Sequence, residues 1–581
     1  MRKGWVEMDD RAAVRRPRRL LSARDLSGCD HRLALDSGVV PDTLAAPESA
    51  AATDVVALTD TPAAEDPSVT RRKEAATAHR ETVAEMLEGL HSDQPGAVVR
   101  VDGAHGGERV AATMAACAAG VAWIWNASLP VDPDAGIRGG SELLVRVADG
   151  YVPVIVVNHR VTVPAPPAKK PAAGSGDTPS APPVTSPLWS WAPTPDPSRA
   201  VRRHRRDLLR LAHLTRLLAH AGLGSSSGLG GSIGLDADCI VVHDLGETLA
   251  DYDAVVTRRS AIAAGELTTG PSRVGECRTC PWWVRCEPEL TATRDVSLVV
   301  NGSQVGALRT AGVLTIDDLA AFDGPVPPDW PGRADLADAV TCARAWLAGV
   351  PLIRRTEEPV VARADVEVDV DMESYGEDGA YLWGTLLTDR TDPAREVLYR
   401  PFVTWDPLPT DDEARSFAEF WAWLMDERAA AHEAGHTFAA YCYSQAAENR
   451  WLLGSARRFA DHPGVPAIGE VEQFIGSPEW VDVYEAVGAN FVCPHGKGLK
   501  KIAPVAGFSW RDPDAGGEAS MDWYRVAVGR DEPASADPDD AAEGQRARLL
   551  RYNEDDVWAT KVLREWIDTT AKDAIPHRSA L

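Results

Sequence analysis

Two pairs of residues in the C-terminal half have the types and spacing of metal ligands. Asp371 and Glu373 end a strand-like stretch in a D-x-E pattern, and side chains two residues apart on a strand point to the same face. Two carboxylates this close repel one another unless cations lie between them. Tyr552 and Asp556 are four residues apart in a helical stretch, so they share one helix face. Carboxylate oxygens suit divalent cations, and these residues therefore predict a metal site.

Cysteines form the second candidate site. Cys277, Cys280 and Cys286 follow a C-x2-C-x5-C pattern near the middle of the chain, and Cys29 is a fourth candidate far upstream. Thiolates at this density usually hold a soft metal or a cluster. Zinc is the rival of iron–sulfur because four-cysteine sites suit both. The wide C-x5-C spacing and the apolar residues 281–283 favour a cluster.

Composition limits the class of protein. The chain has 581 residues, of which 44% are hydrophobic and 25% charged, as expected for a globular protein of several domains. No apolar run is long enough to span a bilayer, and no signal peptide is evident, so we expect no membrane partner. Nine cysteines without regular spacing fit a reducing compartment, which predicts a cytoplasmic protein. The net charge of −26 argues against a non-specific nucleic-acid coat but leaves room for a nuclease with local basic strips.

The N-terminal half reads as mixed α/β. Hydrophobic periodicity predicts a helix over 69–91, and apolar runs predict short strands, the last two joined as a hairpin. Residues 164–200 are rich in Pro, Ala, Ser and Thr, which predicts a disordered insertion. A basic amphipathic helix over 202–220 and a Gly/Ser loop over 222–234 follow. The predicted strands cover 97–101, 120–125, 142–147 and 152–157.

The rest of the chain contains a helical connector and a second α/β region. Two short helices within 296–322 resemble a helix-hairpin-helix element, although a plain helical connector fits equally well. Strands at 366–371 and 381–384 are followed by alternating helices and a strand, and this order predicts an α/β domain. The expected later elements are helices over 411–434, 448–460, 480–487 and 544–567, with a strand over 437–443.

The D-x-E strand with a late Y-x3-D helix resembles the DEDD exonuclease superfamily, which has a ribonuclease-H-like fold. The resemblance places the family's middle carboxylate at Glu448, where the family usually has Asp; Asp482 is a reserve candidate. Residues 498–502 resemble the S-L-K segment that lies beside the family's site, which makes Lys500 a candidate phosphate contact.

This resemblance implies two-metal hydrolysis of phosphodiester bonds. Asp371, Glu373, Glu448 and Asp556 would bind two Mg²⁺ or Mn²⁺ ions, and Tyr552 would orient the attacking water. The activity implied is that of a 3′→5′ exonuclease on single-stranded DNA. Because nothing in the sequence recognises the 2′-hydroxyl, RNA stays open as a substrate.

The four cysteines resemble those of iron–sulfur RecB-like nucleases, and the whole chain resembles a RecB-like protein fused to a YprB-type ribonuclease-H-like domain. The resemblance implies that Cys29, Cys277, Cys280 and Cys286 hold a [4Fe–4S] cluster that closes a PD-(D/E)xK fold. It matches His79 and Glu142 to family residues but places Ile155 and Val157 where the family has an acid and a lysine. We therefore expect this first centre to be inactive or very weak, with Arg202, Arg203 and Arg206 binding DNA instead.

These observations predict a multidomain α/β protein in three parts. Residues 1–290 would form the RecB-like domain, residues 291–355 a helix-hairpin-helix-like connector, and residues 356–581 the exonuclease domain. The predicted function is a metal-dependent nuclease, with helicase or repair proteins as further partners. The alternative is a nucleic-acid-binding or adaptor protein in which both nuclease centres are dormant.

Overall fold

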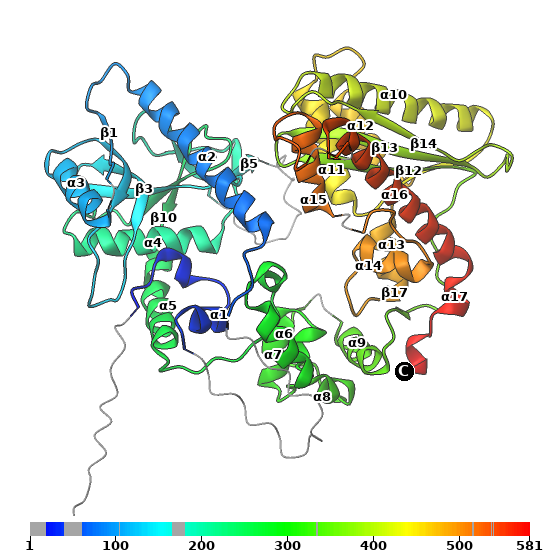
Figure 1. Ribbon diagram of the computed structural model, residues 1–581, viewed down its shortest axis with the longest axis horizontal. Helices are drawn as coiled ribbons and strands as arrows, with labels where there is room; N and C mark the ends of the chain where they lie inside the picture. Colours follow the sequence, from blue (N-terminus) through cyan, green and yellow to red (C-terminus); the bar gives the residue numbers. More distant parts are fainter. Residues whose placement is uncertain are drawn as a thin grey trace, which may run out of the picture. The chain divides into compact units, whose positions relative to one another are not determined.

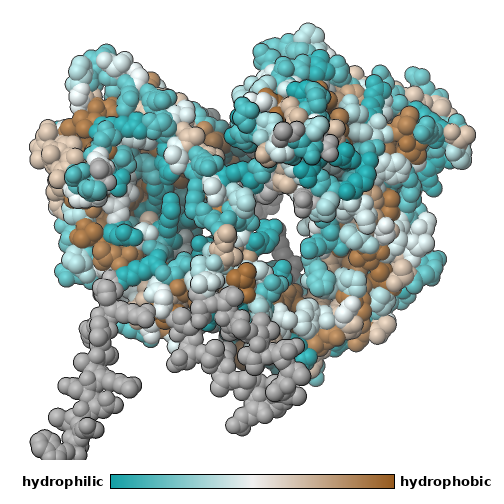
Figure 2. Space-filling view, viewed as in Figure 1, coloured by the Kyte–Doolittle hydropathy of each residue, from teal (hydrophilic) through white to brown (hydrophobic). Residues whose placement is uncertain are grey.

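A computed structural model describes residues 19–39, 61–103, 105–165, 181–332, 335–513, 516–535, 537–538 and 540–581 (Figure 1). The chain divides into two compact units, residues 1–292 and residues 293–581, and each is described here by itself. Among the described residues, no helix is long and apolar enough to cross a membrane. On the face drawn in Figure 2, hydrophilic side chains cover most of the surface and hydrophobic ones form scattered patches.

The first unit is built on an eight-stranded sheet with the order β1-β2-β3-β4-β9-β10-β6-β7. Its first two strands are parallel, and so are β4 and β9, while the other neighbours are antiparallel. In sheet order the strands are β1 (Val98–Arg100), β2 (Trp123–Ser128), β3 (Gly140–Val147), β4 (Gly150–Val156), β9 (Leu229–Ile233), β10 (Ile240–Asp244), β6 (Val184–Ser186) and β7 (Thr194–Pro195).

Both faces of this sheet are covered, which explains why β4 near its centre is apolar and buried along almost its whole length. Trp123 and Trp125 of β2 pack in the cluster that includes Val83 and Leu87 of α2 (Pro67–Leu90). Ile124, between the two tryptophans, packs instead in the cluster that holds the leucines of α4 (Arg205–His220) and the inner residues of α5 (Gly246–Ala264). Alternation along each strand thus divides the core into two layers.

The predicted disordered insertion over 164–200 is wrong in part. Residues 184–186 and 194–195 form β6 and β7 at the edge of the sheet, and β8 (Arg199–Val201) pairs with β5 (Thr162–Pro164). Backbone pairing therefore orders residues that composition alone marks as low in complexity. The stretch 166–180 lies outside the described residues. The predicted Gly/Ser loop likewise contains β9, in which a Cβ at Gly231 would lie 2.6 Å from Ile240 and 2.9 Å from Val154 on the neighbouring strands.

The second unit begins with short helices. α7 (Gly302–Thr310) and α8 (Ile316–Ala320) lie where the two short helices were predicted, and Gly312 in the turn between them has φ +83°, a backbone conformation that favours glycine. α9 (Leu336–Ala348) packs against α8, and their apolar residues form one small cluster.

The main sheet of the second unit has five strands in the order β14-β13-β12-β15-β16. The first three are antiparallel neighbours, and β12, β15 and β16 run parallel to one another. The bounds are β12 (Val366–Tyr375), β13 (Gly379–Asp389), β14 (Leu398–Val403), β15 (Phe438–Cys442) and β16 (Trp480–Asp482). Residues 480–487, predicted as one helix, split into β16 and the start of α13 (Val483–Asn490).

Helices cover both faces of this sheet as well. Val366, Val368 and Val370 of β12 pack with the aromatic residues of α10 (Asp412–Glu433) and with α11 (Gln445–Arg458). The other face of β12 meets α16 (Ala542–Thr569), the long helix near the C-terminus (Figure 1). α12 (Ile468–Ile475), α14 (Leu499–Ile502) and α15 (Gly517–Ala527) complete the unit.

Candidate functional site

Four carboxylates alternate along one face of β12: Glu367, Asp369, Asp371 and Glu373. Because side chains at every second position share a face, all four are directed away from the valines that pack against α10. The first two are neutralised by the fully buried Arg564 of α16, whose Nη2 lies 2.8 Å from an oxygen of Asp369 and whose Nη1 contacts Glu367. The last two receive no such arginine.

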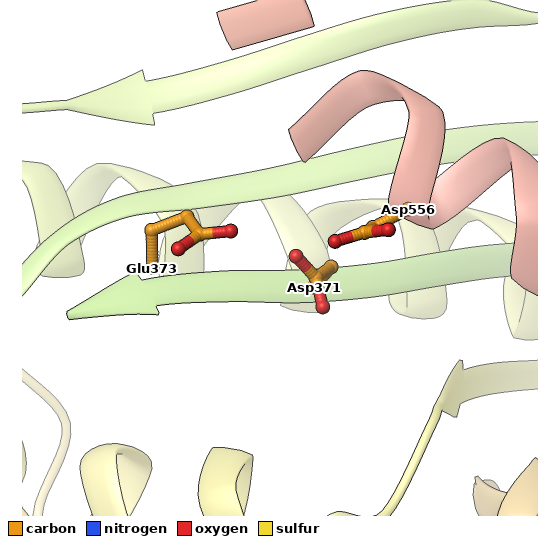
Figure 3. Close-up of side chains that lie close together, drawn as sticks. All are labelled: Asp371, Glu373 and Asp556. Carbon is orange, nitrogen blue, oxygen red and sulfur yellow. The ribbon is translucent and has the colours of Figure 1, made fainter. Parts of the chain in front are cut away.

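Asp371 and Glu373 instead meet Asp556 of α16 (Figure 3). One oxygen from each of the three carboxylates lies within 4.8 Å of the other two. Glu373 and Asp556 are buried and Asp371 is half-buried. Among the described residues, none of the three forms an ion pair with an arginine or lysine. Three clustered anions with no paired cation form a site that fits a divalent metal ion.

A hydrogen-bonded chain orients Asp371. Asn553 Nδ2 donates to Asp371 Oδ2 at 2.8 Å, and the Tyr399 hydroxyl donates to Asn553 Oδ1 at 2.8 Å. Gly384, opposite Asp371 on β13, leaves the space for this amide: a Cβ there would lie 1.6 Å from Asn553 Oδ1. The absence of a side chain at Gly384 thus allows Asn553 to reach the carboxylate.

Asp556 has its own polar neighbours. Trp510 Nε1 donates to Asp556 Oδ1 at 2.7 Å, and Tyr552, one helical turn earlier, also hydrogen-bonds to this carboxylate. Lys500 Nζ donates to the Tyr552 hydroxyl at 3.1 Å and lies 4.4 Å from the centre of its ring. The predicted candidates Lys500 and Tyr552 therefore lie beside the carboxylate cluster.

Burial and mutual repulsion raise the pKa values of the clustered acids. Burial, followed by the negative charges of Asp556, Glu373 and Glu448, holds the pKa of Asp371 well above its usual range. Burial and the charge of Asp556 raise the pKa of Glu373 to about 8. Burial raises the pKa of Asp556 to about 6, an effect that Lys500 and Trp510 oppose. A bound cation would remove this repulsion, so the electrostatics also fit a metal site.

Glu448, the predicted middle ligand, lies near the cluster but is not part of it. It is 3% exposed in the first turn of α11, and burial raises its pKa to about 8. Its Oε2 has no hydrogen-bond partner, and its charge acts on Asp371. The reserve candidate Asp482 instead accepts hydrogen bonds from the backbone N–H groups of residues 444, 445 and 484, which makes it the N-cap of α13.

The four predicted cysteines line one pocket in the first unit. Cys29 precedes α1 (Asp30–Asp36), and the other three lie on the turn of residues 275–280 and in α6 (Trp283–Ala292), with Trp282 and Trp283 beside them. Burial, followed by the charges of Cys280, Cys29 and Cys277, raises the pKa of the Cys286 thiol to about 12. A metal centre would relieve this cost, because it binds thiolates directly.

Arg259 of α5 holds Cys29 in place. This buried side chain donates hydrogen bonds to the carbonyl oxygens of Asp25, Ser27 and Gly28 and also pairs with Asp30. On the other side of the pocket, Trp282 Nε1 donates to an oxygen of Asp36 in α1 at 2.7 Å. The N-terminal segment and the downstream cysteines are thus fastened to each other.

The spacing of the sulfur atoms bears on which metal group would fit. In a tetrahedral zinc site with Zn–S bonds of about 2.3 Å, sulfur atoms lie about 3.8 Å apart. Within the described parts of the chain, the carboxylates of Asp371, Glu373 and Asp556 are the only three potential ligands found within 4.8 Å of one another. No three of the four sulfur atoms lie that close together, although the four cysteines line one pocket.

The acid expected at the first nuclease centre, Glu142, is paired with arginines. Glu142 lies 3.6 Å from Arg80 Nη1 and forms a second ion pair with Arg210. Ile155 and Val157 are buried in the core, and His79 Nε2 contacts the carbonyl oxygen of Gly234 at 3.2 Å. None of these residues belongs to the group of potential metal ligands found in the described part of the chain.

The predicted DNA-binding arginines are exposed around the start of α4: Arg202, Arg203 and Arg206. Sequence reasoning missed Asn553, Tyr399, Trp510 and Gly384, which all support the carboxylate cluster. Only Asn553, directly after Tyr552, carried a signal that could have been noticed. The others come from separate strands and loops.

Residues 371–568 match a family model described as the RNase H superfamily. The matched segment includes Asp371, Glu373 and Asp556, so the carboxylate cluster lies inside it. The C-terminal part of this chain is therefore ribonuclease H-like. Such a domain is consistent with a nuclease, which implies binding to nucleic acid. No curated protein and no solved structure matches the chain.

Proposed function

We propose that this chain hydrolyses phosphodiester bonds of nucleic acid at the carboxylate cluster of the second unit. The observation that carries the proposal is the convergence of Asp371, Glu373 and Asp556 within 4.8 Å without a paired cation. On the same strand, Glu367 and Asp369 are compensated by a buried arginine. If all four acids of this strand had a purely structural role, we would expect each of them to be paired with a cation. Only the acids of the cluster lack one, which supports a role in binding metal.

Asp371, Glu373 and Asp556 would hold divalent metal ions, with Glu448 as the fourth candidate ligand. Mg²⁺ or Mn²⁺ bound there supplies an activated water and stabilises the leaving oxygen of the phosphodiester. Proteins hold these hard cations through carboxylate oxygens, which is the donor set present here.

The surrounding side chains have distinct tasks in this proposal. Asn553 and Trp510 fix the orientation of Asp371 and Asp556 through one hydrogen bond each. Tyr552 holds its hydroxyl between Lys500 and Asp556, where it can orient a water molecule. Lys500 supplies a positive charge that can contact a phosphate oxygen. Burial excludes bulk water and strengthens each of these interactions.

The finer proposal is a 3′→5′ exonuclease on single-stranded DNA, and it rests on the motif resemblance. We test it with the purified full chain, Mn²⁺ and single-stranded DNA labelled at the 5′ end. A ladder of steadily shorter labelled fragments is expected, and EDTA should abolish it. Immediate release of a labelled mononucleotide would mean the opposite polarity, whereas internal cuts in a circular strand would mean an endonuclease.

Asp371→Asn and Asp556→Asn should each lower the rate by more than about 100-fold, because even outer-shell partners of metal ligands are worth roughly 10–100-fold. Asp568→Asn is the matched control: it lies farther along the same helix, outside the cluster, and pairs with Arg363. Equal rates for the wild-type chain and Asp371→Asn would place the activity elsewhere or in a contaminant.

For the first unit, we propose that Cys29, Cys277, Cys280 and Cys286 hold a [4Fe–4S] cluster, with zinc as the alternative. Their shared pocket and the apolar side chains of Trp282 and Trp283 that line it support this proposal. The cluster's role would be structural, since it would join the N-terminal segment to α6, and the unit would serve to bind DNA.

A further inference from the structure

The first unit contains a large cleft, separate from the small cysteine pocket. It is a cleft of about 1010 Å³, lined by α2, by the start of α3 (Gly106–Ala118) and by the ends of β1, β2 and β3. Arg80, Arg100, Arg109 and Arg138 contribute to its walls from four different segments. The protein as a whole has a net charge of −26, so four arginines around one cleft are a local reversal of charge.

The acidic residues of the cleft are already paired, whereas some of its arginines are not. Glu81 accepts a hydrogen bond from Arg100 at 2.5 Å, and Glu142 pairs with Arg80 and with Arg210 behind it. Within the described residues, Arg109 and Arg138 form no ion pair, and Arg109 Nε is buried without a hydrogen-bond partner. The net charge of the cleft is therefore positive, and a positive cleft attracts an anionic ligand.

The acid in this cleft has two arginines beside it. Glu142 is nine-tenths buried, and the guanidinium groups of Arg80 and Arg210 both approach its Oε1, while its Oε2 has no hydrogen-bond partner. Two positive charges beside one carboxylate oppose the binding of a cation there, so we expect no metal-dependent hydrolysis in this cleft.

Backbone groups and apolar side chains complete the walls. The N–H groups of Gly106 and Gly107 begin α3, whose N-cap His105 makes no side-chain capping bond, so the positive end of this helix meets the cleft. Pro130 and the exposed Val131 give an apolar strip beside the arginines. Positive groups alternating with apolar surface suit a ligand in which phosphates alternate with flat apolar rings.

We propose that this cleft binds a single strand of nucleic acid through its phosphates, chiefly at Arg109 and Arg138. The proposal rests on the proposed function only for its choice of nucleic acid over another polyanion. A duplex fits poorly, because its two backbones enclose a cylinder much wider than a cleft of this volume. An acidic protein segment would offer carboxylates but no rings for the apolar strip, and competition by polyglutamate tells the two ligands apart.

The test measures binding of a fluorescein-labelled oligo(dT) of about 20 nucleotides, longer than a typical single binding site, to the full chain in EDTA, so that hydrolysis does not interfere. The variant Arg109→Gln with Arg138→Gln removes two phosphate contacts. By counterion release, we expect affinity to fall about 20-fold at roughly 0.1 M salt, with a shallower dependence of affinity on salt.

The matched control removes two positive charges from the same unit outside the cleft, through Lys73→Gln with Arg160→Gln. Both side chains are exposed and pair with surface acids. This variant should bind within about twofold of the wild-type chain, since distant exposed charges are screened by salt. Hydrogen exchange locates the strand independently: oligo(dT) should protect the amides of residues 106–110.

Unchanged affinity in the cleft variant, or equal losses in the cleft and control variants, would overturn the proposal. So would competition by polyglutamate as strong as that by unlabelled oligo(dT), which would make the cleft a site for acidic protein segments. Failure of the proposed hydrolysis is separate, because it would appear in the Mn²⁺ assay of the wild-type chain and leave the binding data in EDTA unaffected.

Discussion

At the scale of single residues, the carboxylate cluster depends on neighbouring groups that are not part of it. Asp371 is oriented by Asn553, Asn553 by Tyr399, and space for the amide is left by Gly384. A carboxylate held by such a chain has few conformations to lose when a cation binds, which favours affinity and a defined geometry.

The first prediction concerns Gly384→Ala. The added methyl group would lie 1.6 Å from Asn553 Oδ1, so the amide must move and Asp371 loses its partner. We expect hydrolysis to fall by roughly 10–100-fold and the free energy of unfolding by about 1–3 kcal/mol. In the double variant with Asn553→Ala, the clash with the amide is gone and Tyr399 Cε2, at 3.0 Å, is the nearest neighbour left, so the stability losses should be less than additive in denaturant unfolding. Strict additivity would contradict the steric argument.

The second prediction concerns pH. Because the pKa values of Glu373 and Asp556 are raised to about 8 and about 6, the folded chain binds protons more tightly than the unfolded chain. The metal-free protein should therefore lose stability as pH rises from about 5 to 8. Thermal unfolding in EDTA should show this slope, and Glu373→Gln should reduce it. Added Mn²⁺ should stabilise the chain more at pH 8 than at pH 6; the reverse order would contradict a carboxylate metal site.

At the scale of elements, the site forms where β12 crosses α16. Arg564 joins the two, because it lies between Glu367 and Asp369 of the strand, and Arg363 adds a second contact to Glu367 at 2.7 Å. Asp556 lies two turns earlier on the helix that carries Arg564. The buried ion pairs therefore set the helix against the strand at the position that brings Asp556 to Asp371.

The third prediction concerns the ion pairs between Arg564 and β12. Arg564→Met leaves the buried Asp369 without its paired cation and removes one of the cations beside Glu367, so the free energy of unfolding should fall by about 3–5 kcal/mol, and hydrolysis should fall with it. Arg551→Met, an exposed position on the same helix, should change stability by no more than about 0.5 kcal/mol. Denaturant unfolding of both variants measures the difference. Similar values would show that the ion pairs of Arg564 do not hold α16 against β12.

At the scale of the whole molecule, each of the two units contains one of the candidate centres. All residues of the carboxylate cluster lie within residues 293–581, and all four pocket cysteines lie within residues 1–292. Damage to one centre should therefore leave the other intact, unlike in a protein whose site is assembled from both halves.

The fourth prediction tests this separation. Cys277→Ser should remove the visible absorbance and the iron of the purified protein and make the first unit sensitive to proteolysis, because cluster binding contributes to folding. Hydrolysis of a short strand should stay within about twofold of the wild-type rate, since small distant changes are usually additive. Cys493→Ser, outside the pocket, is the control. A colourless wild-type protein with stoichiometric zinc would replace the cluster by zinc.

The order of strands and helices in both units could be predicted from hydrophobic periodicity. An element that buries one or two faces has apolar residues at a regular spacing, and this spacing is visible in the local sequence. The insertion over 164–200 shows the limit. Its composition is low in complexity, yet residues 184–186 pair with β10, and the energy of that pairing comes from a strand distant in sequence. The split of residues 480–487 into strand and helix likewise depends on the neighbour β15.

The sequence by itself determined the candidate ligands, because D-x-E on a strand and Y-x3-D on a helix each set a shared face through local geometry. Only the tertiary structure decided which acids stay uncompensated. Asp369 and Asp371 look alike in sequence, but Arg564, 195 residues from Asp369, neutralises one and not the other. Compensation of charge is a contact between distant segments, and no local pattern encodes it.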